Sequence, residues 1–524
     1  MTFNHRQEGG GKTDTLGKRY GSKLLANLVG LPVNLATQAI IPRGLGPGAY
    51  GDFNFLTNFF TQVFNFLEMG TSLGFYTKLS QRPRETGLVT FYFYFSGLVV
   101  ALIFAIVLLS QVFAASSWIW PSQHLIYIYL AAGWGVLIWF AQVFEKMLDA
   151  YGLTVPGEKA RMVQKVLGLI LLIALFSLHL LHLPGLFLYY FVITAFMIVV
   201  SLRILERQGF SLRLAEKLSW GRIKDYSKEF YHFSHPLFVY GLVAMLANIF
   251  DRWLLQVSHG SVQQGFYSLS LQIGTICFLF TGAMTPLLTR EFAIAFGKED
   301  WPQMAYLFQR YVPLLYSVAA FFSCFVALQA DKVIYIMGGG KFQGALMAVT
   351  IMAFYPIYQT YGQLSSSVFY ATGKTGLYRN IGIAFLILGL PLTYLLIAPR
   401  EMMGLGAGAT GLAVKMVLVQ VLGINVQLYF ISRLLGVNFW RLLGHQCLCL
   451  GCLLAVAWSI TYMFDSLSAL QGKIIYSFLL AGFTYSVVVL VLAHWRPALF
   501  GLQEHDFAAL KERLWNKSAR PGAG

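Results

Sequence analysis

The sequence predicts an all-α, polytopic membrane protein with about fourteen transmembrane helices. Of its 524 residues, 57% are hydrophobic and only 11% are charged, and the mean hydropathy is +0.63. A soluble domain carries roughly twice this charged fraction, so an apolar surface of this extent needs lipid as its solvent. The apolar residues also come in long runs, and the gaps between these runs are alternately rich and poor in Lys and Arg.

The weakly charged runs define the expected spans. Most hold about 20 residues, enough to cross ~30 Å of hydrocarbon as a helix. The expected spans are 24–42, 53–77, 87–112, 125–144, 166–181, 183–202, 231–250, 262–289, 311–330, 342–373, 380–399, 402–432, 442–464 and 474–493. His179, His182 and Pro184 provide the only break between the fifth and sixth, and counting that hairpin as two crossings gives fourteen.

The distribution of basic residues predicts that both chain ends are cytoplasmic. The segments that this topology places inside hold 31 of the 38 Lys and Arg residues, and the outside loops hold six. Cytoplasmic loops of membrane proteins carry such an excess. The net charge of +16 is therefore interpreted as loop charge rather than as a nucleic-acid surface, because no single basic patch forms. The expected inside segments are 1–23, 78–86, 145–165, 203–230, 290–310, 374–379, 433–441 and 494–524.

The expected organisation is two six-helix lobes followed by two further helices. Apolar and basic residues alternate from Phe210 to Trp220, which predicts an amphipathic linker on the inner leaflet at the midpoint of the chain. The expected parts are a cytoplasmic tail 1–23, a lobe 24–206, the linker 207–230, a lobe 231–433, helices 13 and 14 in 434–493, and a cytoplasmic tail 494–524.

Corresponding strings in the two halves predict a parallel internal repeat. G-A-Y-G-D-F precedes the second span of the first half, and Q-Q-G-F-Y-S lies at the same place in the second. Parallel repeats of this kind are one known plan of transporters. No metal site and no cofactor is expected, because the five cysteines are interpreted as small packing residues and no complete phosphate loop is present.

Several of these strings resemble the Wzx-like polysaccharide flippases of the multidrug/oligosaccharidyl-lipid/polysaccharide (MOP) exporter superfamily. The resemblance rests on the order of short strings over most of residues 20–435. They are I-P-R-G-L-G-P-G-A-Y-G-D-F at 41–53, F-S-H-P at 233–236, I-F-D-R-W-L-L-Q at 249–256, G-F-Y-S-L-S at 265–270, T-P-L-L-T-R-E-F at 285–292 and G-A-T-G-L-A at 408–413.

The resemblance implies two lobes around a cavity that opens to alternate faces of a bacterial inner membrane. It implies an oligosaccharide on a polyprenyl pyrophosphate as cargo, moved for the biosynthesis of surface polysaccharides such as O-antigen. Transport rather than enzyme catalysis is expected, driven by Na⁺, H⁺ or another gradient. Membrane lipids, a polysaccharide polymerase and other assembly proteins are the expected partners, and nucleic acid is not.

Two charged residues within spans are candidates for the substrate or ion pathway, because a charge there costs about 2.5 to 3.5 kcal/mol and needs a reason. Glu68 could take up a proton or sodium ion or meet a sugar hydroxyl, or Asn65, Thr71 or Ser72 could simply satisfy it in a helix interface. Lys415 could bind a pyrophosphate, or its ammonium could extend to the outer interface.

The predicted outer loops contain the candidate gate residues. Asp251 and Arg252 end the seventh span, and Arg43 and Asp52 border the first outer loop. A gate is one interpretation; an interfacial ion pair and a residue favoured by a helix dipole are the alternatives. Two prolines are candidate hinges, with static kinks as the alternative: Pro32 in the first span of the first half and Pro236 in the first span of the second half.

Two other functions remain open at this stage. A cation-coupled small-molecule exporter of the multidrug and toxin extrusion (MATE) branch would need acidic residues facing its cavity, and the chain offers chiefly Glu68. A membrane glycosyltransferase or polysaccharide polymerase usually needs a sizeable extramembrane loop with carboxylates, and the expected outer loops are short and contain few acids.

Overall fold

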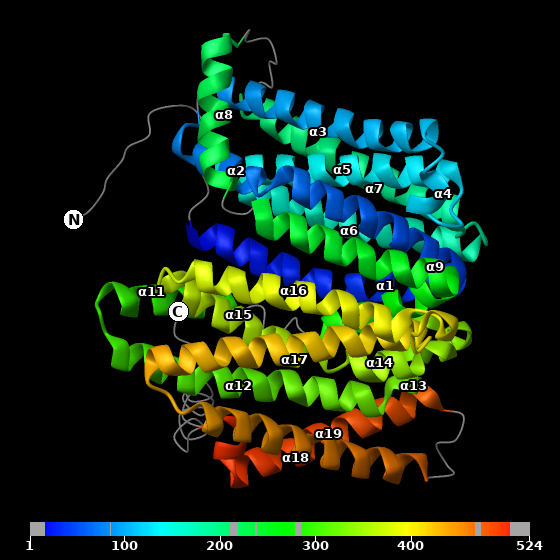
Figure 1. Ribbon diagram of the computed structural model, residues 1–524, viewed down its shortest axis with the longest axis vertical. Coiled ribbons are helices and arrows are strands. Elements are labelled where there is room, and N and C mark those ends of the chain that lie inside the picture. The colour runs from blue at the N-terminus through cyan, green and yellow to red at the C-terminus, as the bar shows by residue number, and fades with distance from the viewer. Residues whose placement is uncertain are drawn as a thin grey trace, which may run out of the picture. The chain divides into compact units, whose positions relative to one another are not determined.

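The computed structural model describes residues 16–83, 85–209, 218–235, 238–277, 284–466 and 473–502. Throughout these residues the regular structure is helical, with no strand. The chain forms two compact units, which divide it between Gly265 and Phe266 (Figure 1). The expected boundaries of the lobes and linker remain a prediction.

The first unit contains the helices up to the first part of α9. These helices are α1 (Leu16–Glu68), α2 (Thr71–Gln81), α3 (Thr86–Val112), α4 (Ser116–Ile119), α5 (Leu125–Ala150), α6 (Thr154–Ser177), α7 (Leu183–Arg207), α8 (Trp220–Ser234) and α9 (Phe238–Ile276). Helix α1 packs along α5 and α6, and α7 packs on both of these. Helix α8 instead crosses the ends of α2 and α3 (Figure 1).

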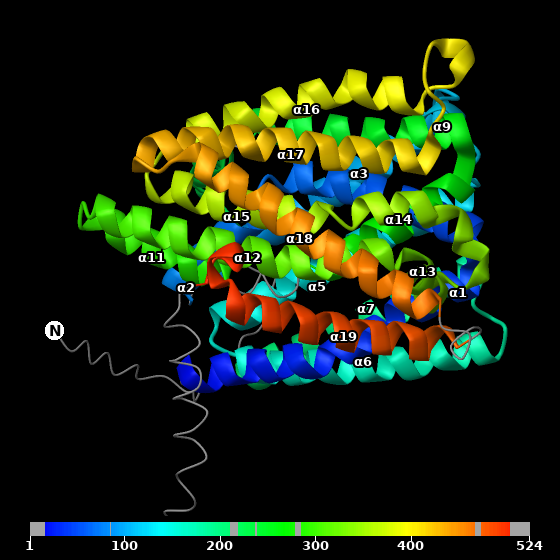
Figure 2. The ribbon, with the colours of Figure 1, turned by 90° about the horizontal axis from the view of Figure 1, so that it is seen from below.

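The second unit holds the remaining helices. They are α11 (Thr285–Gly297), α12 (Trp301–Leu328), α13 (Ala330–Gly338), η2 (Gly340–Ala345), α14 (Leu346–Met352), α15 (Tyr355–Ala371), α16 (Thr375–Ile397), η3 (Arg400–Met402), α17 (Gly408–Leu435), α18 (Phe439–Asp465), α19 (Ile474–Trp495) and η5 (Pro497–Phe500). A continuous apolar core joins α12 to α15, α17, α18 and α19. Helices α18 and α19 lie side by side (Figures 1 and 2).

The composition of the helices confirms the predicted polytopic membrane fold. Ten of the helices in the described ranges are long and apolar enough to cross a bilayer: α3, α5, α6, α7, α9, α12, α16, α17, α18 and α19. Large apolar side chains such as Leu108, Phe113 and Phe483 remain exposed on them. Exposure of this kind is what lipid-facing walls require, because lipid tails are as apolar as these side chains.

Two long helices are each two helices joined at a glycine kink. Gly46 in α1 has φ 73° and ψ 172°, and Gly260 in α9 has φ 74° and ψ −173°. This backbone region is open essentially to glycine alone. Gly51 and Gly265 follow the two kinks at the same spacing, so the related strings in the two halves of the sequence adopt related geometry.

Three expected boundaries are corrected. The span expected over 53–77 is interrupted between Glu68 and Thr71, where Met69 and Gly70 adopt positive φ values. The span expected over 342–373 consists of η2, α14 and α15. The inside segment expected over 145–165 is no loop, because α5 continues to Ala150 and α6 begins at Thr154.

Candidate transport site

A cluster of charged side chains lies among the helices of the first unit, where α1, α2, α5 and α6 meet. Glu68 ends α1, and its Oε1 accepts a hydrogen bond from the backbone N–H of Ser72 at 3.0 Å. Lys146 of α5 donates to the Ser72 hydroxyl, and its Nζ lies 3.9 Å from Glu68 Oε1. Glu68 therefore satisfies an N–H in the first turn of α2 and also faces a cation.

The second part of this charge cluster consists of Arg161 of α6 and the two glutamates with which it pairs. The Arg161 guanidinium lies 2.8 Å from Glu145 Oε2 on α5, and 3.0 Å from Oε1 of Glu158 on its own helix. Glu158 is buried, whereas Arg161 and Glu145 are half-buried. A buried carboxylate is tolerated only when it is paired, and this guanidinium supplies the partner of both glutamates.

Lys165 differs from the other cations of the cluster. It lies one turn further along α6, half-buried, and no carboxylate lies within ion-pair distance of it in the described part of the chain. A Cβ built on Gly30 of α1 would lie 2.5 Å from Lys165 Nζ, so the ammonium group lies directly against the backbone of α1. This ammonium is the cation of the cluster that can accept an anionic group without first losing an ion pair.

One predicted outer gate residue, Asp52, belongs to a separate network at the two glycine kinks. Asp52 Oδ1 accepts hydrogen bonds from Gln123 Nε2 at 2.6 Å and from the Ser261 hydroxyl. Gln256 in turn donates to Ser261 Oγ at 3.0 Å. We call Asp52, Gln123, Gln256 and Ser261 the outer corner. Their hydrogen bonds link the helical segments beside the two kinks to the segment that follows α4.

Arg252 and Gln264 form hydrogen bonds across the kink of α9. The Arg252 guanidinium donates to Gln264 Oε1 at 3.1 Å, and Gln264 Nε2 donates back to the carbonyl of Arg252 across Gly260. Asp251 and Arg252 are both buried, whereas Arg43 is exposed on α1 before its kink. Asp251 and Arg252 are thus in the interior and Asp52 is half-buried; the assignment of all four residues to a gate stays a prediction.

Close backbone contacts tighten the outer corner. A Cβ on Gly51 would overlap the carbonyl oxygen of Ser261, and a Cβ on Gly265 would overlap the carbonyl oxygen of Pro47. Each glycine therefore lets the backbone after one kink lie against the backbone near the other.

Lys415 lies in the second unit, in α17. Its side chain is buried, and a Cβ built on Gly389 of α16 would lie 2.9 Å from Lys415 Cε. The small glycine leaves room for the lysine stem between the two helices. Nearby in the same unit, Gln420 Nε2 donates to Gln359 Oε1 at 2.5 Å. The pathway role of Lys415 stays a prediction.

The assignment of Pro32 and Pro236 as hinges stays a prediction. Pro32 lies within α1 and is exposed, but the kink in that helix is at Gly46. Pro236 lies outside the described residues. No group of three or more His, Cys, Asp or Glu side chains suited to a metal ion occurs in the described part of the chain.

The sequence did not predict Lys146, Arg161 and Lys165 as candidate site residues. They fall in 145–165, which was expected to be an inside segment between two spans, and charged residues in such a segment need no special explanation. The helical signal was present, because Val155 and the small residues Gly157 and Ala160 continue the apolar pattern towards the following span. Helical spacing also places residues 158, 161 and 165 on one face of α6.

This fold, helical throughout the described residues and with charged groups held among the spans, is that of a polytopic membrane protein. A family model described as "Polysaccharide biosynthesis protein" matches residues 16–289, more than half of the chain. The chain belongs to this family.

Solved structures with similar folds come from the MOP superfamily, as the resemblance predicted. One is described as "Lipid II flippase MurJ, inward closed conformation"; it shares 12% identity at a TM-score of 0.64, over 90% of this chain and 98% of that one. Another, an inward-facing multidrug resistance MATE family transporter of the MOP superfamily, shares 16% identity at a TM-score of 0.58, over 80% and 99%. At these identities the likeness concerns the fold. A comparison with curated proteins finds no significant match.

Proposed function

We propose that this protein is a flippase for an oligosaccharide linked to a polyprenyl pyrophosphate, which it moves from the inner to the outer leaflet of the bacterial inner membrane. In this proposal both chain ends lie in the cytoplasm, and the cargo serves surface polysaccharide biosynthesis. The protein is a transporter rather than an enzyme, because the cargo crosses without covalent change.

Family membership and fold support the class of cargo. The chain belongs to a polysaccharide biosynthesis family, and the MurJ structure with a similar fold is described as a flippase of Lipid II. A cargo of this kind has three chemically different parts: a lipid chain that prefers the bilayer, a glycan that prefers water, and a diphosphate that needs cations.

The environment of Lys165 is the observation that carries the proposal. Its ammonium group is half-buried against Gly30 and has no carboxylate at ion-pair distance within the described residues. Phosphate oxygens make charge-assisted hydrogen bonds to such a group, and these are stronger than neutral hydrogen bonds. We propose that Lys165 binds the diphosphate, while the ion pairs of Lys146 and Arg161 keep the neighbouring carboxylates neutralised.

The outer corner supports a mechanism of alternating access. Its hydrogen bonds tie three chain segments at the face that the charge pattern assigns to the outside. In this mechanism the corner is closed while Lys165 is accessible from the cytoplasm, and it opens to release the cargo. The coupling ion is proposed to be Na⁺ or H⁺, with Glu68 as the group that responds to it.

Reconstitution tests the proposed function. Purified protein in liposomes is supplied with a fluorescent polyprenyl-pyrophosphate oligosaccharide, and leaflet exchange is followed with and without a sodium or proton gradient. The proposal predicts exchange well above that of protein-free liposomes and no export of a cationic dye. Absence of exchange under every gradient, together with robust dye export, would instead indicate a small-molecule exporter.

A further inference from the structure

Helix α8 is firmly docked on α2 and α3, although it is not among the helices long and apolar enough to cross a bilayer. Tyr226 and Phe230 are buried, and their rings lie 5.3 Å and 5.6 Å from the ring of Phe91 on α3. The opposite face of α8 is exposed and carries Lys224 and Lys228. Helix α8 is therefore amphipathic, with one face on protein and a basic face open to its surroundings.

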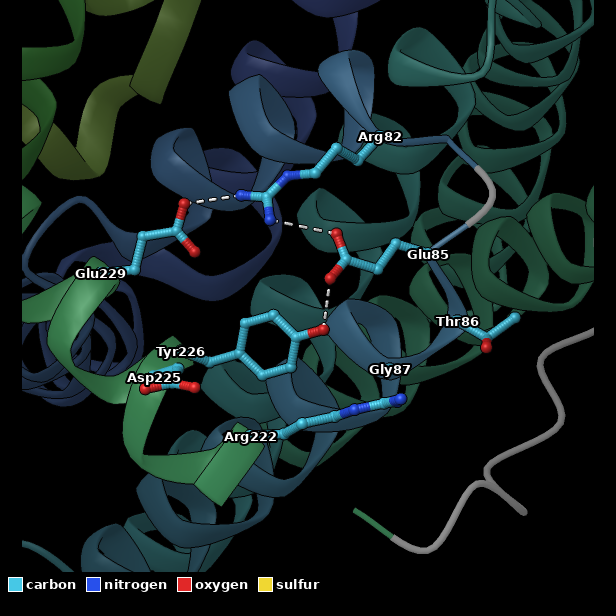
Figure 3. A pocket seen from close by; sticks show the side chains of 8 residues that line it. All are labelled: Arg82, Glu85, Thr86, Gly87, Arg222, Asp225, Tyr226 and Glu229. Atoms are coloured by element: carbon cyan, nitrogen blue, oxygen red, sulfur yellow. Dashed lines mark hydrogen bonds and ion pairs between the residues drawn. The ribbon is translucent and has the colours of Figure 1, made fainter. Parts of the chain in front are cut away.

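An ion-pair network secures this docking. Glu229 of α8 accepts hydrogen bonds from Lys78 and, at 2.6 Å, from Arg82. Arg82 also lies 3.2 Å from Glu85 Oε2, and the Tyr226 hydroxyl donates to Glu85 Oε1 at 2.5 Å (Figure 3). Burial alone would raise the pKa of Glu229, but the hydrogen bonds and charges of Lys78 and Arg82 outweigh it and hold that pKa below its ordinary value.

A pocket of about 500 Å³ opens beside this network. Its charged and hydroxyl-bearing walls come from the α2–α3 turn and from α8: Arg82, Glu85, Arg222, Asp225, Tyr226 and Glu229 (Figure 3). Arg82 is paired with both Glu85 and Glu229. Asp225 is exposed and has no ion-pair partner in the described part of the chain, and it lies one turn after Arg222 on α8.

The pocket lies where a span meets water. Thr86 and Gly87 line it, and they form the first turn of α3, an apolar helix long enough to cross the bilayer. Helix α8 runs across the ends of α2 and α3, which is the orientation of a helix in the membrane interface (Figure 1). Trp220, at the start of α8, is 81% exposed, and tryptophan is enriched at membrane interfaces.

The charges in the pocket select the class of ligand. A purely anionic headgroup would meet three carboxylates, and a purely cationic one would meet two guanidinium groups. A ligand with both charges can place its phosphate at Arg222 and its ammonium at Asp225. We propose that this pocket binds the headgroup of phosphatidylethanolamine, whose primary ammonium donates hydrogen bonds to the Asp225 carboxylate. The proposal does not depend on the cargo of the transporter.

Lipid titrations of the purified full-length protein test this site. Bound lipid is measured by native mass spectrometry, and stability by the melting temperature, with phosphatidylethanolamine, phosphatidylcholine or phosphatidylglycerol of matched acyl chains. Phosphatidylethanolamine should bind about tenfold more tightly than phosphatidylcholine, whose trimethylated ammonium has no N–H to donate. Equal binding of the two, or strongest binding of the anionic phosphatidylglycerol, would overturn the proposal.

Matched variants on α8 assign the binding to the pocket. Asp225→Asn and Arg222→Gln should each remove the preference for phosphatidylethanolamine, whereas Lys224→Gln, on the exposed face of the same helix, should keep it. Free O-phosphoethanolamine should displace the lipid, because it carries the same headgroup. If the two pocket variants retain the preference, or the free headgroup fails to compete, then the lipid binds elsewhere or through its acyl chains and the proposal is wrong.

Discussion

Single glycines determine how closely the two kinks approach each other. We predict that Gly51→Ala destabilises the protein by about 1–3 kcal/mol, because its methyl group would overlap the fixed carbonyl oxygen of Ser261. Gly48→Ala is the matched control, since a Cβ there meets nothing within 4 Å. Thermal unfolding in detergent measures both variants. Equal melting temperatures would show that the corner is less tightly packed than described.

A substitution of Glu68 can distinguish a structural role of its side chain from a role in transport. Gln at this position can still accept the hydrogen bond from the Ser72 N–H but loses its charge opposite Lys146. We predict that Glu68→Gln inserts and folds normally while cargo exchange falls, and the same outcome is predicted for Lys415→Ala. Wild-type exchange in both variants would remove these residues from the pathway.

The predictability of individual residues depended on their context in the sequence. Glu68 attracted notice because a carboxylate in an apolar run is costly. Its partner Lys146 did not, and neither did Lys165, because charges beside the end of a span fit a loop equally well. The contact between Lys165 and Gly30 joins residues far apart in the chain, and no local pattern contains it.

The helices were predicted better than their interruptions. Apolar runs located most spans, because about 20 apolar residues have few alternatives to a transmembrane helix. Gly46 and Gly260 fall in the outer loops expected over 43–52 and 251–261, so a break was predicted at both places. That each break is a kink at a glycine was not predicted, since glycine is common in membrane helices and the close contacts at Gly51 and Gly265 join residues far apart in the chain. The interface role expected of the linker remains a prediction, tested by the lipid titrations; α8, part of that linker, begins at Trp220.

The docking of α8 should depend on pH. The pKa of Glu229 is lower in the docked state than its ordinary value of 4.5, so docking is favoured above that value and weakens as the pH falls through the lowered pKa. We predict that amide hydrogen exchange of residues 220–234, corrected for its intrinsic pH dependence, rises only below pH 4.5 in the wild type.

Two substitutions test this prediction, one at Glu229 itself and one at a control residue. Glu229→Gln should raise exchange in α8 already at neutral pH, because the charged partner of Lys78 and Arg82 is lost. Glu206→Gln, an exposed residue at the end of α7, should leave the profile unchanged. A wild-type profile that persists in Glu229→Gln would mean that another group controls docking.

A polar contact connects one end of α18 and of α19 to α13. The buried ammonium of Lys332 on α13 donates to Asp465 at 2.7 Å and to the Ser477 hydroxyl at 3.1 Å. Asp465 is half-exposed, which weakens the pair, so Lys332→Gln should cost about 1 kcal/mol of stability. Lys473→Gln, at an exposed lysine nearby, should cost less than about 0.5 kcal/mol in the same melting experiment.

The class of the whole molecule followed from composition and charge alone. A chain so apolar must lie in a bilayer, and the excess of Lys and Arg in alternate segments predicts its orientation. The chemistry of transport did not follow in the same way. It depends on which charged side chains keep a partner once the helices pack, and that is decided by contacts between α1, α2, α5 and α6.

Exchange of a labelled lipid-linked oligosaccharide by the Lys165→Gln variant tests the central claim most directly. Lys159→Gln is the matched control, because Lys159 is an exposed lysine on the same helix. Loss of the ammonium should slow exchange in liposomes by about tenfold or more, while the control retains the wild-type rate. Equal rates in the two variants, at equal amounts of folded protein, would contradict the claim that Lys165 binds the diphosphate of the cargo.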